Sequence, residues 1–194
     1  MARCDALPRE FFARDPVTVA QELLGKQLVR EEDSGVLTGI IVETEAYLAA
    51  QDPANHAYSK RRHCYRKTPR CAPMFGPPGY TYVYRSYGLH FCLNIVTEEE
   101  EIPSAVLLRA VQPEVGIDVM QRRRGIGSLA TLTTGPGNLC QAFGIDLALN
   151  GWDVTRGQHL WVAMSASSAS LRIVRSRRIG VADDLELRFS VVSR

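Results

Sequence analysis

The stretch Val36-Leu-Thr-Gly-Ile-Ile-Val-Glu-Thr-Glu-Ala-Tyr47 is a long, largely apolar run rich in β-branched residues. Such a run predicts a strand. The polar stretch Glu32-Asp33-Ser34-Gly35 before it is typical of a turn, and residues 27–30 before that turn predict a second strand. Because a short turn joins the two strands, we expect them to pair antiparallel.

Helix signals flank this pair. Asp15 as N-cap, Pro16 at the first helical position and Gly25 just past the end predict a short helix over residues 17–24. Further helices are predicted at 114–124 and 138–143. Strands are predicted at residues 80–84, 90–97, 105–111, 159–164, 171–174 and 185–192.

Few helices separate consecutive strands, which favours an α+β class with a largely antiparallel sheet and helices packed around it. The length of 194 residues fits one domain over residues 1–194. Residues 49–79 lack a periodic pattern, and loops of that length in a compact domain are usually functional or disordered.

Composition excludes several classes of protein. Hydrophobic residues make up 45% and charged residues 23%, as in folded soluble proteins. No apolar window is long enough for a membrane span, and the N-terminus does not resemble a signal peptide. The five cysteines are scattered without a C-x-x-C pair, which indicates reduced thiols. We expect a cytoplasmic protein, nucleoid-associated in a bacterium or nuclear in a eukaryote, and no membrane contact.

Tyrosines and basic residues gather in one part of the chain. All seven tyrosines fall within residues 47–87, and the same stretch holds a single acid, Asp52. Its basic residues include Lys60, Arg61, Arg62, Arg66, Lys67 and Arg70. Basic residues interleaved with aromatic ones favour a surface that follows a nucleic-acid backbone and stacks on bases. A tyrosine-rich core edge beside a solvated basic loop is the alternative.

The tyrosines also have a pattern of their own. Tyr80, Tyr82 and Tyr84 recur at every second residue, so on a strand they share one face, where they can line an aromatic pocket. Tyr87 and Gly88 fall between two predicted strands, which places Tyr87 near the tip of a hairpin. An aromatic side chain there can act as a wedge, or it can pack over a neighbouring turn.

Glu43, Glu45 and Tyr47 share a face at the end of the long strand. Two carboxylates beside an aromatic ring indicate hydrolytic chemistry. Side chains that leave one strand in parallel cannot easily flank a scissile bond, so we expect one acid to be catalytic and the other structural. An exposed Glu-x-Glu pair on an edge strand is the alternative.

Other candidate sites are weaker. His56, His63, Cys64 and Cys71 match no zinc spacing and lie among cations, so no metal is expected. Gly135-Pro136-Gly137 is either a phosphate-binding helix start or a plain turn. Two groups of arginines are either a phosphate-binding surface or solvated faces: Arg122, Arg123 and Arg124, and Arg172, Arg175, Arg177 and Arg178.

Several blocks in order resemble the alkyladenine (3-methyladenine, N-methylpurine) DNA glycosylase family. They include Ile41-Val-Glu-Thr-Glu-Ala-Tyr47, His56, Arg66-Lys-Thr-Pro-Arg70, Tyr82-Val-Tyr84, Tyr87-Gly88, Phe91-Cys-Leu-Asn94, Val106-Leu-Leu-Arg109 and Gly135-Pro136. The resemblance implies a curved antiparallel sheet with surrounding helices and a protruding β-hairpin. The segment 56–66 is a few residues longer than in the vertebrate enzymes.

The resemblance also implies roles for single residues. Glu45 matches the general base that activates the attacking water, and Arg109 matches the arginine that helps to hold that water and the carboxylate. The base pocket corresponds to Tyr47, His56, Tyr84 and Asn94, the last obstructing the 2-amino group of guanine. Tyr87 matches the intercalating wedge, and Arg66 and Thr68 match positions near the DNA backbone.

The function expected is therefore base-excision repair. The enzyme would flip alkylated or deaminated purines (3-methyladenine, 7-methylguanine and hypoxanthine type) from duplex DNA and hydrolyse the N-glycosidic bond, without a lyase step. We expect a monomer that needs no metal or organic cofactor. The alternatives are a non-catalytic single-stranded nucleic-acid-binding module and a nucleoside hydrolase that uses Glu43 or Glu45.

Overall fold

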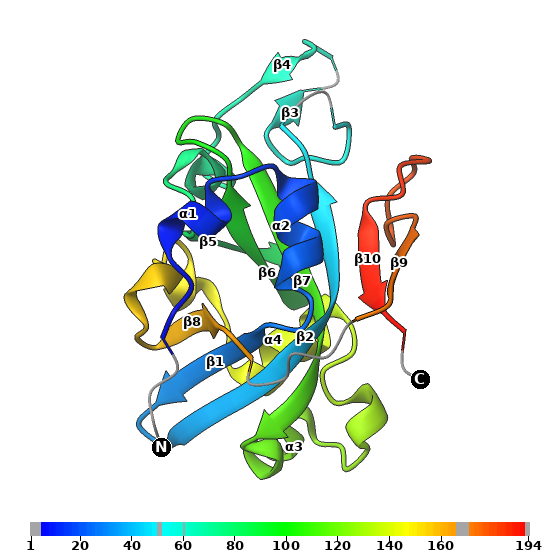
Figure 1. The fold of residues 1–194 in the computed structure, drawn as a ribbon. Helices are drawn as coiled ribbons and strands as arrows, with labels where there is room; N and C mark the ends of the chain where they lie inside the picture. The colour runs from blue at the N-terminus through cyan, green and yellow to red at the C-terminus, as the bar shows by residue number, and fades with distance from the viewer. Residues whose placement is uncertain (1–4, 50–51, 60, 166–170, 193–194) are drawn as a thin grey trace.

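The computed structural model describes residues 5–49, 52–59, 61–165 and 171–192 (Figure 1). Its main sheet has eight strands, hydrogen-bonded in the order β5-β6-β7-β2-β1-β8, with β10 beside β2 and β9 beside β10. The bounds are β1 Gln27–Glu32, β2 Gly35–Tyr47, β5 Thr81–Ser86, β6 His90–Thr97, β7 Ser104–Val115, β8 Leu160–Ala163, β9 Ile173–Ser176 and β10 Arg188–Val191. The strand pairs of this sheet are antiparallel.

Helices cover this sheet, and a separate small hairpin lies apart from it in the view (Figure 1). The hairpin consists of β3 Tyr58–Ser59 and β4 Cys64–Tyr65. The α-helices are α1 Arg9–Phe12, α2 Pro16–Leu23, α3 Ile117–Arg124 and α4 Pro136–Phe143, and the 3-10 helices are η1 Ala72–Phe75, η2 Leu129–Thr131, η3 Leu147–Leu149 and η4 Val154–Arg156. The predicted α+β class and antiparallel sheet are confirmed.

The long strand β2 organises the sheet. Its first half pairs with β1 and its residues 43–45 pair with β10, while β7 follows its other edge. The register with β7 shifts around residues 38–39 and 41–44, and such bulges bend a strand. Gly39 lies at one of them, where a Cβ atom would meet the backbone oxygen of Gln112 at 2.8 Å. Glycine is therefore required at this bend.

Helix α2 packs against one face of β2. Asp15 caps the helix by accepting a hydrogen bond from the Thr18 amide at 2.9 Å, as the sequence predicts. The Thr44 hydroxyl donates to the Ala20 carbonyl oxygen at 2.8 Å, which places Thr44 on the helix side of the strand. Because side chains alternate along a strand, Glu43 and Glu45 are directed to the opposite face.

The hydrophobic core has two parts. The larger cluster lies between the helices and the sheet and includes Phe12, Leu23, Ile41, Leu108 and Phe143. A smaller cluster around Met74, Phe75 and Tyr82 packs on the other side of β6 and β7, with Tyr80 and Tyr84 against it. It supports the aromatic residues of the candidate site.

Most predicted elements are present, with shifted ends. The helix expected at 114–124 begins only at Ile117, because β7 continues to Val115 and Gly116 then turns the chain with a φ of 75°. The strand expected at 185–192 begins at Arg188. Helix α1 and the small β3–β4 hairpin have no counterpart among the predicted elements. No helix in the described residues is long and apolar enough to cross a bilayer.

Candidate active site

A cavity of about 680 Å³ lies between the β5–β6 hairpin, the loop after β2 and residues 179–183. This volume is in the range of pockets that bind small molecules, about 300–1,000 Å³. Six residues that the sequence predicts for the site line it: Tyr47, His56, Tyr84, Tyr87, Asn94 and Arg109. Arg70, Tyr82 and Asp183 line it as well.

One wall of the cavity is aromatic. Tyr82 and Tyr84 project from the same face of β5, with ring centroids 5.3 Å apart in a stacked arrangement. The His56 imidazole stands edge-on to Tyr84, with centroids 4.6 Å apart. The Arg70 guanidinium lies over the Tyr84 ring at 5.3 Å from its centroid. A planar, electron-poor base therefore meets electron-rich rings in this wall.

Arg109 on β7 bridges the two carboxylates of β2. Its Nε atom donates to Glu43 Oε1 at 2.9 Å, and its Nη1 atom lies 3.3 Å from Glu45 Oε1. Burial alone would lower the pKa of Arg109, but the charges of Glu45 and Glu43 raise it above its usual value. Arg188 from β10 also donates to Glu43 Oε1, at 3.2 Å. Glu43 is thus held by two guanidinium groups.

Glu45 is fully buried, with 0% exposure, and it does not line the cavity. Its Oε1 atom accepts a hydrogen bond from the Ile179 amide at 2.9 Å, and its Oε2 atom accepts one from the Tyr47 hydroxyl at 3.0 Å. The carboxylate of Glu45 therefore does not face the cavity directly. It lies directly behind three residues of the cavity wall, Tyr47, Arg109 and Ile179.

Burial shifts the pKa values of three polar side chains of the cavity. Burial, and next the negative charge of Glu45, raise the pKa of Tyr47, so its hydroxyl remains a donor to that carboxylate. Burial, and next the charge of Arg70, lower the pKa of His56, which favours a neutral imidazole. The His56 Nδ1 atom is 2.9 Å from the Tyr82 hydroxyl. Burial raises the pKa of Tyr82 to about 12.

Asn94 is fixed in place on β6. It is 4% exposed, and its Nδ2 atom donates to the Tyr82 carbonyl oxygen of the paired strand at 2.9 Å. Since this hydrogen bond crosses the hairpin, the side chain cannot turn away without losing it. A group that enters the cavity at this point meets a rigid amide.

Tyr87 occupies the tip of the β5–β6 hairpin. The Leu89 amide donates to the Ser86 carbonyl oxygen at 3.0 Å, and Tyr87 and Gly88 both have positive φ angles, 48° and 70°. This is the pattern of a type I′ turn. Tyr87 is 93% exposed and Leu89 74% exposed. A bulky residue in a left-handed conformation without burial is typical of a functional position.

Arg66 and Thr68 lie outside the cavity, on the chain between β4 and η1. Arg66 is exposed, and its amide donates to the Ala57 carbonyl oxygen at 2.7 Å. The Thr68 hydroxyl is 3.1 Å from Cys71 Sγ. Their proposed proximity to the DNA backbone stays a prediction. Among the described residues, no group of three or more His, Cys, Asp or Glu residues is arranged to bind a metal ion.

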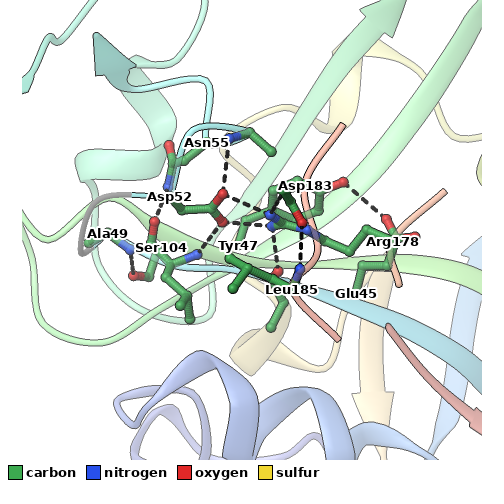
Figure 2. Close-up of polar contacts among 12 residues, drawn as sticks. Glu45, Tyr47, Ala49, Asp52, Asn55, Ser104, Arg178, Asp183 and Leu185 are labelled. Atoms are coloured by element: carbon green, nitrogen blue, oxygen red, sulfur yellow. Dashed lines mark hydrogen bonds and ion pairs between the residues drawn. The ribbon is translucent and has the colours of Figure 1, made fainter. Parts of the chain in front are cut away.

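The buried ion pairs of Arg178 are not indicated by the sequence. As one of the C-terminal arginines, Arg178 was a candidate for a phosphate-binding surface or a solvated face, but it is buried and pairs with Asp52 and Asp183. Figure 2 shows this network beside Glu45 and Tyr47. The only available signal was Asp52 itself, the single acid in a basic, tyrosine-rich stretch.

The cavity is aromatic, has an arginine-bound carboxylate behind it and lies beside an exposed hairpin tip. This arrangement fits an enzyme that hydrolyses N-glycosyl bonds. Comparison with known proteins identifies the same class of enzyme. A family model described as methylpurine-DNA glycosylase (MPG) matches residues 10–194. The chain belongs to this family of DNA-repair glycosylases, which act on DNA. The alternative of a non-catalytic binding module is thereby set aside.

Curated relatives cover almost the whole chain. A protein of Carboxydothermus hydrogenoformans named "Putative 3-methyladenine DNA glycosylase" is 46% identical over 94% of this chain and 93% of its own length. Relatives of the same name from Methanoculleus marisnigri and Desulfitobacterium hafniense are 47% and 44% identical, over 94% and 90% of this chain and 93% and 87% of their own lengths.

Proposed function

We propose that this enzyme, as a monomer, removes alkylated and deaminated purines of the 3-methyladenine, 7-methylguanine and hypoxanthine type from double-stranded DNA. The observation that carries the proposal is the contact of Arg109 and the Tyr47 hydroxyl with Glu45, directly behind a cavity walled by tyrosines. The relatives' name supports a methylated purine as substrate.

The base must leave the duplex before it can enter this cavity, at a cost of a few kcal/mol. Tyr87 at the hairpin tip would fill the space that the base leaves. Stacking on Tyr47, with edge contacts from Tyr84 and His56, offsets the cost at roughly 1–3 kcal/mol per good stack. Asn94, which the Tyr82 carbonyl oxygen holds in place, would clash with the 2-amino group of normal guanine.

In the chemical step, Glu45 takes a proton from a water whose oxygen bonds to C1′, and the N-glycosidic bond breaks with its electron pair on the departing base. The carboxylate also stabilises positive charge on the sugar, while Arg109 holds the carboxylate in place. Because Glu45 has no exposed surface, a water reaches its carboxylate only when one of its contacts with the cavity wall opens.

Duplexes of one sequence, with and without a single hypoxanthine, and duplex DNA treated with a methylating agent test the proposal. The enzyme should release the damaged base and leave a site that alkali cleaves. Glu45→Gln should keep duplex affinity and lose at least about a hundredfold in single-turnover excision rate, the scale of general base catalysis. Glu99→Gln, on an exposed turn, is the matched control.

Two outcomes would contradict this mechanism. Excision by Glu45→Gln at the rate of the unmodified enzyme removes the role given to Glu45. A covalent enzyme–DNA adduct trapped by borohydride would show a lyase step, which is not expected because neither Lys26 nor Lys67 lines the cavity and the chain has only one other lysine.

A further inference from the structure

Residues 179–183 form one wall of the cavity and cover Glu45. The Ile179 amide donates to Glu45 Oε1 at 2.9 Å, and the segment continues along the cavity to Asp183. The carboxylate beneath has no exposed surface. The position of this segment therefore decides what Glu45 contacts, and that position depends on what holds the segment in place.

The buried guanidinium of Arg178 holds the far end of the segment, and Arg178 itself begins the near end (Figure 2). At the near end, Arg178 directly precedes Ile179. At the far end, its Nη2 atom donates to Asp183 Oδ2 at 2.6 Å. The side chain of Arg178 is 0% exposed. Gly180, between the two ends, has a φ of 75°, and a Cβ atom added to it would meet no other atom within 4 Å, so the middle is less closely packed than the ends.

The same guanidinium is tied to the chain that carries the pocket. Its two terminal nitrogens bind Asp52 in a bidentate pair, at 2.6 and 2.8 Å, and Nη1 donates to the Ala46 carbonyl oxygen at 3.0 Å. Asp52 in turn accepts from the amides of Leu48 and Ala54, at 3.0 and 2.9 Å. Arg178 thus joins the cavity wall to the end of β2 and to the loop that leads to His56.

Arg178 also contacts Tyr47 directly. Its guanidinium carbon lies 4.6 Å from the centroid of the Tyr47 ring, and the hydroxyl of that ring donates to Glu45 Oε2. Two of the three groups that donate to Glu45, the Ile179 amide and the Tyr47 hydroxyl, therefore depend on Arg178 for their positions. The third donor, Arg109, belongs to β7.

Stability alone is a weak reason for this arrangement. Burial alone would lower the pKa of Arg178, but hydrogen bonds and the charges of Asp52 and Asp183 raise it well above its usual range. Buried ion pairs contribute little net stability, because desolvation offsets the attraction between the charges. The ion pairs of Arg178 with Asp52 and Asp183 do provide a fixed geometry next to Glu45.

We propose that Arg178 is a positioning residue for base excision: through Asp52 and Asp183 it sets the segment 179–183 and the Tyr47 ring against Glu45. The inference rests on the proposed role of Glu45. It predicts that loosening Arg178 slows the chemical step without weakening the capture of DNA, since Arg178 lies beneath the surface.

Arg178→Lys tests this, because lysine keeps the charge but cannot hold Asp52, Asp183 and the Ala46 carbonyl oxygen in one planar arrangement. We expect single-turnover excision on the hypoxanthine duplex to slow at least tenfold, with duplex affinity within threefold. Asp183→Asn, which keeps the Arg178–Asp52 pair, should slow excision three- to tenfold. Arg177→Lys is the matched control, since the side chain of Arg177 is 69% exposed and pairs with Asp184.

Each outcome decides the proposal. The proposal is overturned if both variants, Arg178→Lys and Asp183→Asn, fold as judged by circular dichroism and excise the base as fast as the unmodified enzyme. Affinity and excision that fall in parallel with the folded fraction would show a merely structural role. If Arg178→Lys does not fold, Asp183→Asn decides alone. Glu45→Gln in the same assay separates the two proposals. Full activity of Glu45→Gln refutes the role of Glu45. If Glu45→Gln is inactive while the Arg178 and Asp183 variants are fully active, only the positioning role is refuted.

Discussion

At Glu43 and Glu45 the structure distinguishes two carboxylates that look equivalent in the sequence. Glu43 receives hydrogen bonds from two guanidinium groups, those of Arg109 and Arg188, on a single oxygen atom. Glu45 instead contacts an amide, a hydroxyl and, at 3.3 Å, Arg109. The pair of carboxylates and the pair of guanidinium groups sum to zero charge. Glu43 therefore fixes Arg109, which supports the proposal that Glu45 is the acid of the chemical step.

His56 provides a prediction that depends on pH. Burial and the charge of Arg70 both lower its pKa below the usual 6.5, which favours the neutral imidazole in a cavity proposed to bind cationic purines. We expect the His56 resonance in a nuclear magnetic resonance titration to change below pH 6.5. In Arg70→Gln the midpoint should move upward, but not fully, because burial remains.

The control for this titration is Arg61→Gln, which removes an exposed arginine on the connection between β3 and β4. It should leave the midpoint of His56 unchanged. A His56 midpoint at or above 6.5 in the unmodified enzyme would contradict the lowered pKa. A midpoint that does not respond to Arg70→Gln would show that the charge of Arg70 does not act on this imidazole.

At the scale of elements, the sequence predicts those helices and strands that depend on local residue patterns. The Asp15 cap and Pro16 mark helix α2, and alternation along β2 places Glu45 and Tyr47 on one face. The register shifts within β2 leave no such signal, because a bulge depends on how the partner strand pairs. The β3–β4 hairpin is likewise only two residues per strand, too short for a periodic pattern.

The β5–β6 hairpin carries the next prediction. Tyr87 is 93% exposed, so Tyr87→Ala removes almost no buried surface and should leave the melting temperature essentially unchanged. If the ring fills the space of a flipped base, its loss should slow excision from duplex DNA by about tenfold, the scale of one stacking contact. Excision from the same single-stranded sequence should change less, since no stacked duplex has to be held open.

Leu89→Ala is the matched control, because Leu89 belongs to the same turn and is 74% exposed. It should have a smaller effect on duplex excision than Tyr87→Ala. Equal losses in duplex and single-stranded DNA for Tyr87→Ala would mean that Tyr87 acts on the base pocket and not as a wedge. An unchanged duplex rate would remove its role altogether.

For the whole molecule, the limit of sequence reasoning lies in contacts between distant segments. Arg178 and Asp52 are 126 residues apart in the chain, and nothing local to either one indicates the other. The resemblance to a family named six residues that line the cavity, whereas the buried position of Glu45 depends on how residues 179–183 fold over β2. The burial of Glu45 and the ion pairs of Arg178 thus follow from long-range packing and not from the motifs.

The distribution of charge over the whole molecule leads to a last prediction, on salt dependence. The net charge is only +2, yet Arg61, Arg62 and Arg66 are exposed and pair with no acid among the described residues. Arg123, by contrast, pairs with Glu32 at 2.5 Å, and Arg122 with Asp118 at 2.8 Å.

A free arginine that contacts a phosphate releases a counterion, which contributes about −0.9 to the slope of log affinity against log salt. Arg66→Gln should therefore make the slope for duplex DNA shallower by about 0.9, whereas Arg123→Gln should leave it unchanged. Fluorescence anisotropy across a salt series measures both slopes, and equal slopes for the two variants would place the DNA on another face of the molecule.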